Sequence, residues 1–195
     1  MDLVTLVLAC SLYADNSITS AMVKLGSDSN PLTITVHKNP SEIQILTFKT
    51  PASAIQFAQQ EIGQKHVVDL GIMQIPSPWL SHYDLTLADV FRPCKNMIVA
   101  TNILNHIADQ CSTQACILST YKTGDPQLGL DYATQITTYA QAHPFIKPPS
   151  IFTATHTKAS TTTVEASQTT KNTDFQPQSS KEPTTEEPAA LGNTL

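Results

Sequence analysis

The chain has 195 residues, a length that suits one domain with an appendage. Eleven Lys and Arg against sixteen Asp and Glu give a net charge of −5, and with no basic stripe this argues against a generic nucleic-acid-binding protein. The longest apolar run, Leu3 to Ala9, is far shorter than the roughly 18 to 20 residues of a membrane-spanning helix, so an integral membrane protein with a transmembrane segment is excluded.

The N-terminal segment ends in Val7-Leu8-Ala9-Cys10, which looks like the end of a lipoprotein signal. A signal peptide normally has a basic n-region and a longer apolar stretch, whereas here the n-region is only Met1 and Asp2. We therefore expect a first buried helix whose Cys10 forms a bridge, and either a truncated start or a signal that this chain lacks.

The next segment has the periodicity of a helix with one apolar face. Asn16 or Ser17 is expected as its N-cap and Gly26 as its end. The residues of that face are Ala14, Ile18, Ala21, Met22 and Leu25. Two short segments rich in β-formers follow, Leu32 to Val36 and Ile43 to Phe48, and predict a small hairpin.

Helices are predicted over most of the remainder. One opens at Thr50-Pro51, with Thr as cap and Pro in the first turn, and ends at Gly63. A second begins just after Pro93, and two more follow at about Gln114 to Tyr121 and about Pro126 to Ala142. The predicted fold class is mainly α with a minor β element.

The composition changes near Pro148-Pro149. Residues 150–195 contain twelve Thr, five Ser and three Pro, so this stretch has too little apolar surface to offset the entropy of ordering it. We expect one domain over residues 1–149 and a disordered tail over 150–195. A glycosylated stalk and a partner-binding tail are sharper alternatives to a plain solvated end.

Four cysteines fall in the first part, and an even number suits two disulfides in an oxidising compartment. Cys111 and Cys116 are close enough to clamp the turn between two helices, which would leave Cys10 to join the helix of Cys94. Spacing does not fix this connectivity, and four reduced buried thiols remain the alternative. No cysteine pair has zinc-knuckle spacing and the six histidines do not cluster, so no metal site and no cofactor are predicted.

Four short segments occur in an informative order. They are Gly26 to Leu32 (GSDSNPL), Asp69 to Ile75 (DLGIMQI), Phe91 to Asn96 (FRPCKN) and Leu118 to Gly124 (LSTYKTG). Together they resemble the soluble lytic transglycosylases, lysozyme-like enzymes that cut peptidoglycan. The similarity runs from about Cys10 to Ala142 and is closest to the transglycosylases of type IV secretion systems. The resemblance implies a lysozyme-like (α+β) fold and a groove for a glycan strand.

Members of this family begin the first motif with Glu-Ser. The Glu protonates the glycosidic oxygen and then acts as base while the muramyl C6 hydroxyl closes on C1. Aligning Ser27, Asn30 and Pro31 with that motif puts Gly26 at the position of the Glu, so no catalytic residue is assigned. Asp28 is the candidate substitute acid, although its side chain is shorter and projects differently. A plainer explanation of Gly26 is a helix C-cap.

The other motif positions carry over one at a time, as expectations of the resemblance. Ser27 matches the serine that orients the family's Glu, and Met73 and Gln74 match a pair that lines the glycan subsites. Tyr121 matches a tyrosine whose hydroxyl points toward the acid, whereas Lys122 replaces the asparagine that follows it.

These departures favour a pseudoenzyme. We expect a periplasmic, peptidoglycan-binding component of a type IV secretion or conjugation apparatus, with weak or absent transglycosylase activity. Two alternatives remain: an active transglycosylase that uses Asp28, and a non-enzymatic protein that recruits secretion-system subunits.

Overall fold

The computed structural model describes residues 2–39 and 42–146. Residues 1–150 form one compact unit, and the Thr-rich tail predicted from residue 150 lies outside the described residues. Within the described part, the helices are α1 (Leu3–Cys10), α2 (Asn16–Ser27), α3 (Pro51–Gly63), α4 (Trp79–His82), α5 (Leu87–Val90), α6 (Pro93–Ala108), α7 (Gln114–Thr123) and α8 (Leu130–Ala142). The strands are β1 (Thr33–Asn39), β2 (Glu42–Thr47), β3 (Val67–Leu70) and β4 (Ile75–Pro76).

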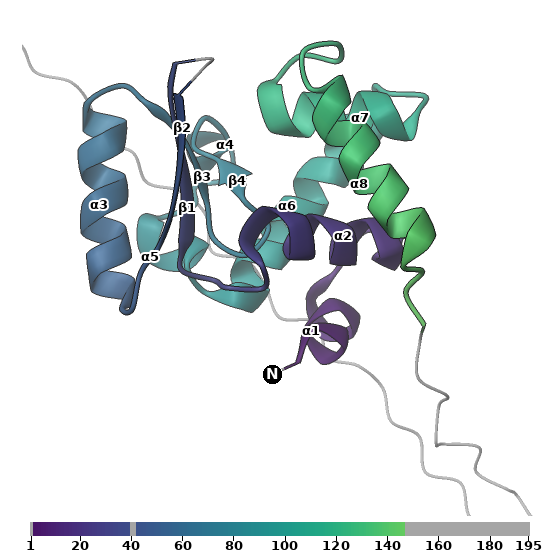
Figure 1. Cartoon of the computed structure of the whole chain (residues 1–195), viewed down its shortest axis with the longest axis horizontal. Coiled ribbons are helices and arrows are strands. Elements are labelled where there is room, and N and C mark those ends of the chain that lie inside the picture. The colour runs from purple at the N-terminus through teal and green to yellow at the C-terminus, as the bar shows by residue number, and fades with distance from the viewer. Residues whose placement is uncertain (1, 40–41, 147–195) are drawn as a thin grey trace, which may run out of the picture. The chain divides into compact units, whose positions relative to one another are not determined.

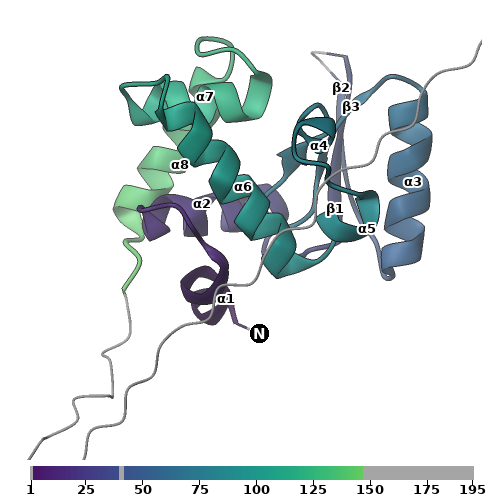
Figure 2. The same ribbon diagram turned by 180° about the vertical axis from the view of Figure 1, so that it is seen from behind.

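The strands form one antiparallel sheet in the order β2-β1-β3-β4. Helix α3 covers one face, and α2, α6, α7 and α8 lie on the other side (Figure 1); Figure 2 shows the same layers from behind. The expected class, mainly α with a small β-hairpin, is confirmed. Strands β3 and β4 extend the hairpin; they contain only four and two residues, too few to be predicted from the sequence.

The register of the sheet decides which side chains face the helices. Thr35 pairs with Asp69 and His37 pairs with Val67, so these four residues share one face of the sheet. Side chains on the opposite face pack toward α3, where the rings of Phe48 and Phe57 lie 5.2 Å apart. The face that carries His37 and Asp69 is therefore the one that borders the functional site.

Local sequence explains most helix ends, with two corrections. The N-cap of α2 is Asp15 rather than Asn16 or Ser17, because the Asp15 carboxylate accepts hydrogen bonds from the backbone N–H groups of residues 17 and 18. Helix α8 starts at Leu130 rather than Pro126. The Asp125 carboxylate accepts bonds from the N–H groups of residues 127 and 128, and this turn delays the helix.

Two disulfides close the fold, and both follow the pairing favoured by the sequence. Cys10 at the end of α1 is joined to Cys94 at the start of α6, and Cys111 is joined to Cys116 across the turn between α6 and α7. The expected buried first helix is also confirmed, since Leu6, Val7 and Cys10 are buried. No helix in the described part of the chain is long and apolar enough to cross a membrane.

Candidate functional site

The position of the missing acid, Gly26, lies inside the last turn of α2. The helix continues to Ser27, and the left-handed C-cap is Asp28, with φ of +49°. Gly26 itself has no positive φ. The C-cap explanation of Gly26 is therefore wrong, and glycine is not needed there for backbone conformation.

Space, rather than backbone conformation, distinguishes Gly26. A Cβ placed on Gly26 would lie 2.9 Å from Gln74 Cγ, well inside the usual carbon–carbon contact distance of about 3.5–4.0 Å. The absence of a side chain at position 26 is therefore matched to the position of the Gln74 side chain.

Gln74 is buried, and its amide is held by three hydrogen bonds. Its Nε2 donates to the carbonyl oxygens of Thr33 (3.1 Å) and Gly71 (2.7 Å), and its Oε1 accepts from Thr35 Oγ1 at 2.6 Å. These bonds hold it although its φ of +52° is uncommon for a residue with a side chain. Both amide protons are used inside the protein, so in this conformation the amide has no proton left for a sugar.

Ser27 and Tyr121 hold the segment 72–74 from two sides. Ser27 Oγ lies within donor distance of the carbonyl oxygens of Val23 (3.0 Å) and Ile72 (2.8 Å). Tyr121 Oη donates to the Met73 carbonyl at 3.0 Å. Burial raises the pKa of the Tyr121 phenol well above its ordinary value, so the hydroxyl remains a donor.

The structure thus brings Ser27, Met73, Gln74 and Tyr121 together, as the motifs predict, but all four are buried. The side-chain polar atoms of Ser27, Gln74 and Tyr121 bond within the protein. The four residues form a buried frame, and their predicted role in the glycan cleft stays a prediction.

Asn96, from the third motif, anchors the same segment. Its Nδ2 donates to the carbonyl oxygens of Leu70 and Val90, and its Oδ1 accepts from the Met73 N–H at 2.9 Å. Gly71 lies against Asn96. Glycine is needed there because φ is +76° and a Cβ would lie 2.4 Å from Asn96 Nδ2. The motifs therefore share one packing unit, which explains why they occur together.

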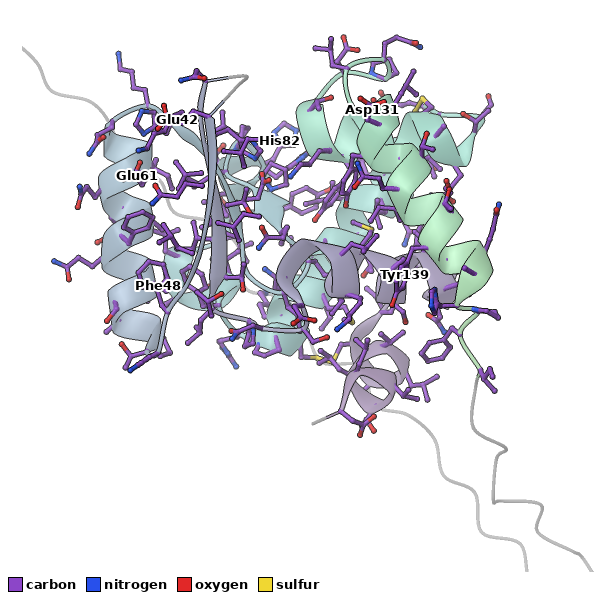
Figure 3. All side chains as sticks on the ribbon, viewed as in Figure 1. Glu42, Phe48, Glu61, His82, Asp131 and Tyr139 are labelled. Atoms are coloured by element: carbon purple, nitrogen blue, oxygen red, sulfur yellow. A yellow bond between two sulfur atoms is a disulfide. The ribbon has the colours of Figure 1, made fainter. Side chains whose placement is uncertain are left out.

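Asp28, the candidate substitute acid, points to solvent. Its side chain is 79% exposed and pairs with Lys24, one helical turn earlier. Two further acids, Glu42 and Glu61, belong to other elements. Figure 3 shows Glu61 on α3 and Glu42 at the start of β2, and Glu61 is bonded to His66 at 2.8 Å.

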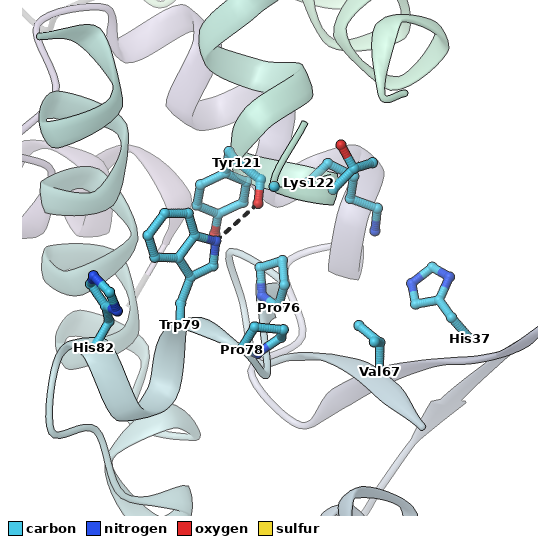
Figure 4. Close-up of a pocket in the computed structure, with 10 residues that line it drawn as sticks. His37, Val67, Pro76, Pro78, Trp79, His82, Tyr121 and Lys122 are labelled. Carbon is cyan, nitrogen blue, oxygen red and sulfur yellow. Dashed lines mark hydrogen bonds between the residues drawn. The ribbon is translucent and has the colours of Figure 1, made fainter. Parts of the chain in front are cut away.

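Beside the buried frame is a cavity of about 430 Å³ between the sheet and α7 (Figure 4). His37 and Lys122 lie on one side of it, and Trp79 and His82 lie on the other. Trp79 Nε1 donates to the Tyr121 carbonyl at 3.2 Å, which fixes the indole as a wall. The full lining is His37, Val67, Pro76, Pro78, Trp79, His82, Tyr121, Lys122, Thr123 and Gly124.

On the His37 side of this cavity, three charged or titratable residues form what we call the basic cluster: His37, Asp69 and Lys122. His37 Nε2 lies 2.7 Å from Asp69 Oδ2, and the Lys122 ammonium pairs with the same oxygen. The Asp69 side chain is only 1% exposed, whereas those of Lys122 and His37 are 21% and 27% exposed. The two bases therefore face the cavity, and the Asp69 carboxylate lies beneath them, away from the cavity.

The basic cluster also affects a neighbouring phenol. The Lys122 ammonium lies 5.5 Å from the centre of the Tyr132 ring. Burial, and to a lesser degree the Asp69 charge, raises the pKa of Tyr132 well above its ordinary value. Lys122, which departs from the family motif, thus supplies the counter-charge of a buried carboxylate.

Sequence reasoning did not identify Trp79, His37, His82 or Asp69 as site residues. The signal for Trp79 was available, because it is the single tryptophan and follows the 69–75 motif by four residues. His37 carries no local signal. Asp69 opens the 69–75 motif, but only the pairing of β1 with β3 brings it beside His37.

The sequence is similar to known proteins over the region that contains most of these residues. Residues 37–138, just over half of the chain, match the family described as Transglycosylase SLT domain. Met73, Gln74 and Tyr121 lie inside this range, whereas Gly26 and Ser27 precede it. The chain is similar to Protein virB1 of Agrobacterium fabrum, with 29% identity over 141 residues, which is 68% of this chain and 56% of that protein. No solved structure matches.

Proposed function

This chain belongs to the transglycosylase SLT domain family, and from that premise we propose that it is a peptidoglycan-binding component of a type IV secretion apparatus with weak or absent cleavage activity. Membership of the family supports the murein ligand. The likeness to Protein virB1, of which the chain spans 56%, supports the secretion context.

The observation that best supports weak or absent activity is that position 26 has no acid and that Gln74 occupies the space beside it. Glycine has no titratable group, and the Gln74 side chain occupies the space beside it. A positioned general acid contributes typically about 10²- to 10⁴-fold to a rate, and more when one group also serves as base. Cleavage by this protein is therefore expected to be slow or undetectable.

Neighbouring carboxylates do not offer a replacement. Asp28 is exposed and paired with Lys24, away from the cavity. Asp69 is nearest to the site, but its side chain is only 1% exposed and its Oδ2 is already paired with His37 and Lys122. A general acid must reach the glycosidic oxygen, so a carboxylate held behind these two side chains is poorly suited to the role.

We propose a periplasmic location for the protein. Two disulfides with no free cysteine in the described residues suit an oxidising compartment, and murein is found there. The secretion-system subunits that it would contact are a proposal from the same family context.

Two assays on the full chain test this function. Sedimentation with insoluble sacculi is expected to retain the protein, and digestion of purified sacculi is expected to release no 1,6-anhydromuropeptides above background. Asp28→Ala should change neither result, because its side chain points to solvent. Release at the rate of an active transglycosylase would refute the loss of activity, and failure to sediment would refute murein binding.

A further inference from the structure

The cavity has an unusual charge for this chain. The protein carries a net charge of −5, yet the cavity lining contains two histidines, one lysine and neither Asp nor Glu. The one carboxylate of the basic cluster, on Asp69, lies behind the bases. Among the residues that the structure describes, Lys122 is therefore the only Lys, Arg, Asp or Glu residue that lines the cavity.

Lys122 retains hydrogen-bonding capacity toward the cavity. An ammonium group has three donors, and the pair with Asp69 Oδ2 uses one of them. The same pair fixes where the ammonium lies, so little side-chain entropy is lost when a second oxygen binds. His37 is held in the same way by its bond to Asp69.

The opposite wall suits a sugar. Trp79 is fixed by its bond to the Tyr121 carbonyl, and Pro76 and Pro78 continue the apolar surface. An indole and proline rings are surfaces on which the C–H face of a pyranose can pack. The cavity thus combines an apolar wall with a basic edge across a volume of about 430 Å³.

We propose that this cavity selects murein segments that carry a free carboxylate, bound at the Lys122 ammonium while the sugar packs against Trp79. The inference rests on the proposed function and specifies its ligand. Murein offers such a carboxylate from two sources: the lactyl group of muramic acid from which the peptide has been removed, and the peptide stem. Lys122 acts here as a specificity residue in place of the family's asparagine.

The test uses the full-length protein and the fluorescence of Trp79, which is the only tryptophan in the chain. Four probes of matched length are titrated: peptide-free murein strands, the same strands with their carboxylates amidated, peptide-bearing strands, and their amidated form. A neutral oligomer of N-acetylglucosamine serves as the reference glycan. At least one murein form is expected to bind about tenfold more tightly than its amidated counterpart, as charge-assisted bonds allow.

The two sources separate in this design. Preference confined to peptide-free strands identifies the lactyl carboxylate, and preference confined to peptide-bearing strands identifies the stem. Equal affinity before and after amidation, with glycan binding retained, would overturn the inference and leave the proposed function intact. Absence of binding in all five titrations would overturn both.

Variants assign the effect to the cavity. Lys122→Asn is expected to lose the tenfold preference and to keep the affinity for the neutral oligomer, whereas Lys122→Arg should retain the preference because it keeps the charge. Lys95→Asn removes the same charge from an exposed position on α6, outside the cavity, and should leave all affinities unchanged. If Lys122→Asn does not fold, the wild-type titrations still decide the question.

Discussion

Gln74 fills the space that a side chain at position 26 would need, since a Cβ on Gly26 would lie 2.9 Å from Gln74 Cγ. The two positions come from motifs that are 48 residues apart in sequence. Because the two positions are in contact, a side chain added at position 26 should disturb the packing of Gln74. The resulting change in the free energy of unfolding can be measured.

Substitution Gly26→Ala tests the contact by itself. In an unobstructed helix this change stabilises by up to about 1 kcal/mol, because alanine has the higher helix propensity. Here the added methyl group presses on Gln74, and overpacking costs about 1–3 kcal/mol, so a net loss of about 1 kcal/mol is expected. Urea denaturation measures the difference.

Gly63→Ala is the matched control. Gly63 ends α3, and a Cβ there meets nothing within 4 Å, so this variant should be neutral or slightly more stable. If both variants change stability equally, the space beside Gly26 is not occupied as described.

Gly26→Glu should restore a proton donor at the expected position. Because Gln74 must rotate to admit it, the variant is expected to be less stable than the wild type and yet to release 1,6-anhydromuropeptides at least about tenfold faster. Gly26→Gln has the same shape without the acid and should remain inactive. A folded Gly26→Glu protein that cuts no faster than Gly26→Gln would show that the groove has lost more than its acid.

Alkaline pH is expected to destabilise the protein through the phenols of Tyr121, which is buried, and Tyr132, which is partly buried. Burial raises the pKa of Tyr121 and Tyr132 in the folded state above the ordinary value of about 10, so the unfolded chain releases these protons first. The two phenols make their full contribution to the free energy of unfolding below pH ~10. Above pH ~10 the free energy of unfolding falls, by up to about 1.4 kcal/mol per pH unit for each phenol.

Denaturation midpoints between pH 8 and pH 11 measure the slope of the free energy of unfolding against pH. Tyr121→Phe should reduce the slope and, at pH 8, cost about 1–3 kcal/mol, because the Met73 carbonyl loses its donor. Tyr83→Phe is the control, since its pKa is raised only by partial burial and it makes no hydrogen bond in the described structure. A slope unchanged in Tyr121→Phe would contradict the assignment.

The two disulfides should contribute unequally. Cys10 and Cys94 are 84 residues apart, and Cys111 and Cys116 are five apart. Loop-closure entropy predicts a loss of about 4 kcal/mol for the paired Cys10→Ala and Cys94→Ala variant, and about half of that for Cys111→Ala and Cys116→Ala. Thermal denaturation of the two double variants compares them, and equal losses would contradict the loop-length explanation.

Local sequence by itself determined the six longer helices of the described residues, the hairpin and the family resemblance, but not the four-residue helices α4 and α5. Caps such as Thr50 and the apolar spacing of α2 act within a few residues, so they can be read along the chain. It also showed that position 26 lacks an acid, because that is a matter of residue identity.

Only the tertiary structure decided which residues face the cavity. Met73 and Gln74 match residues that line the glycan subsites in the family, yet both are buried and neither lines the cavity. The basic cluster draws His37 from β1, Asp69 from β3 and Lys122 from α7. Such contacts between distant segments depend on strand register and helix packing, and no local pattern encodes them.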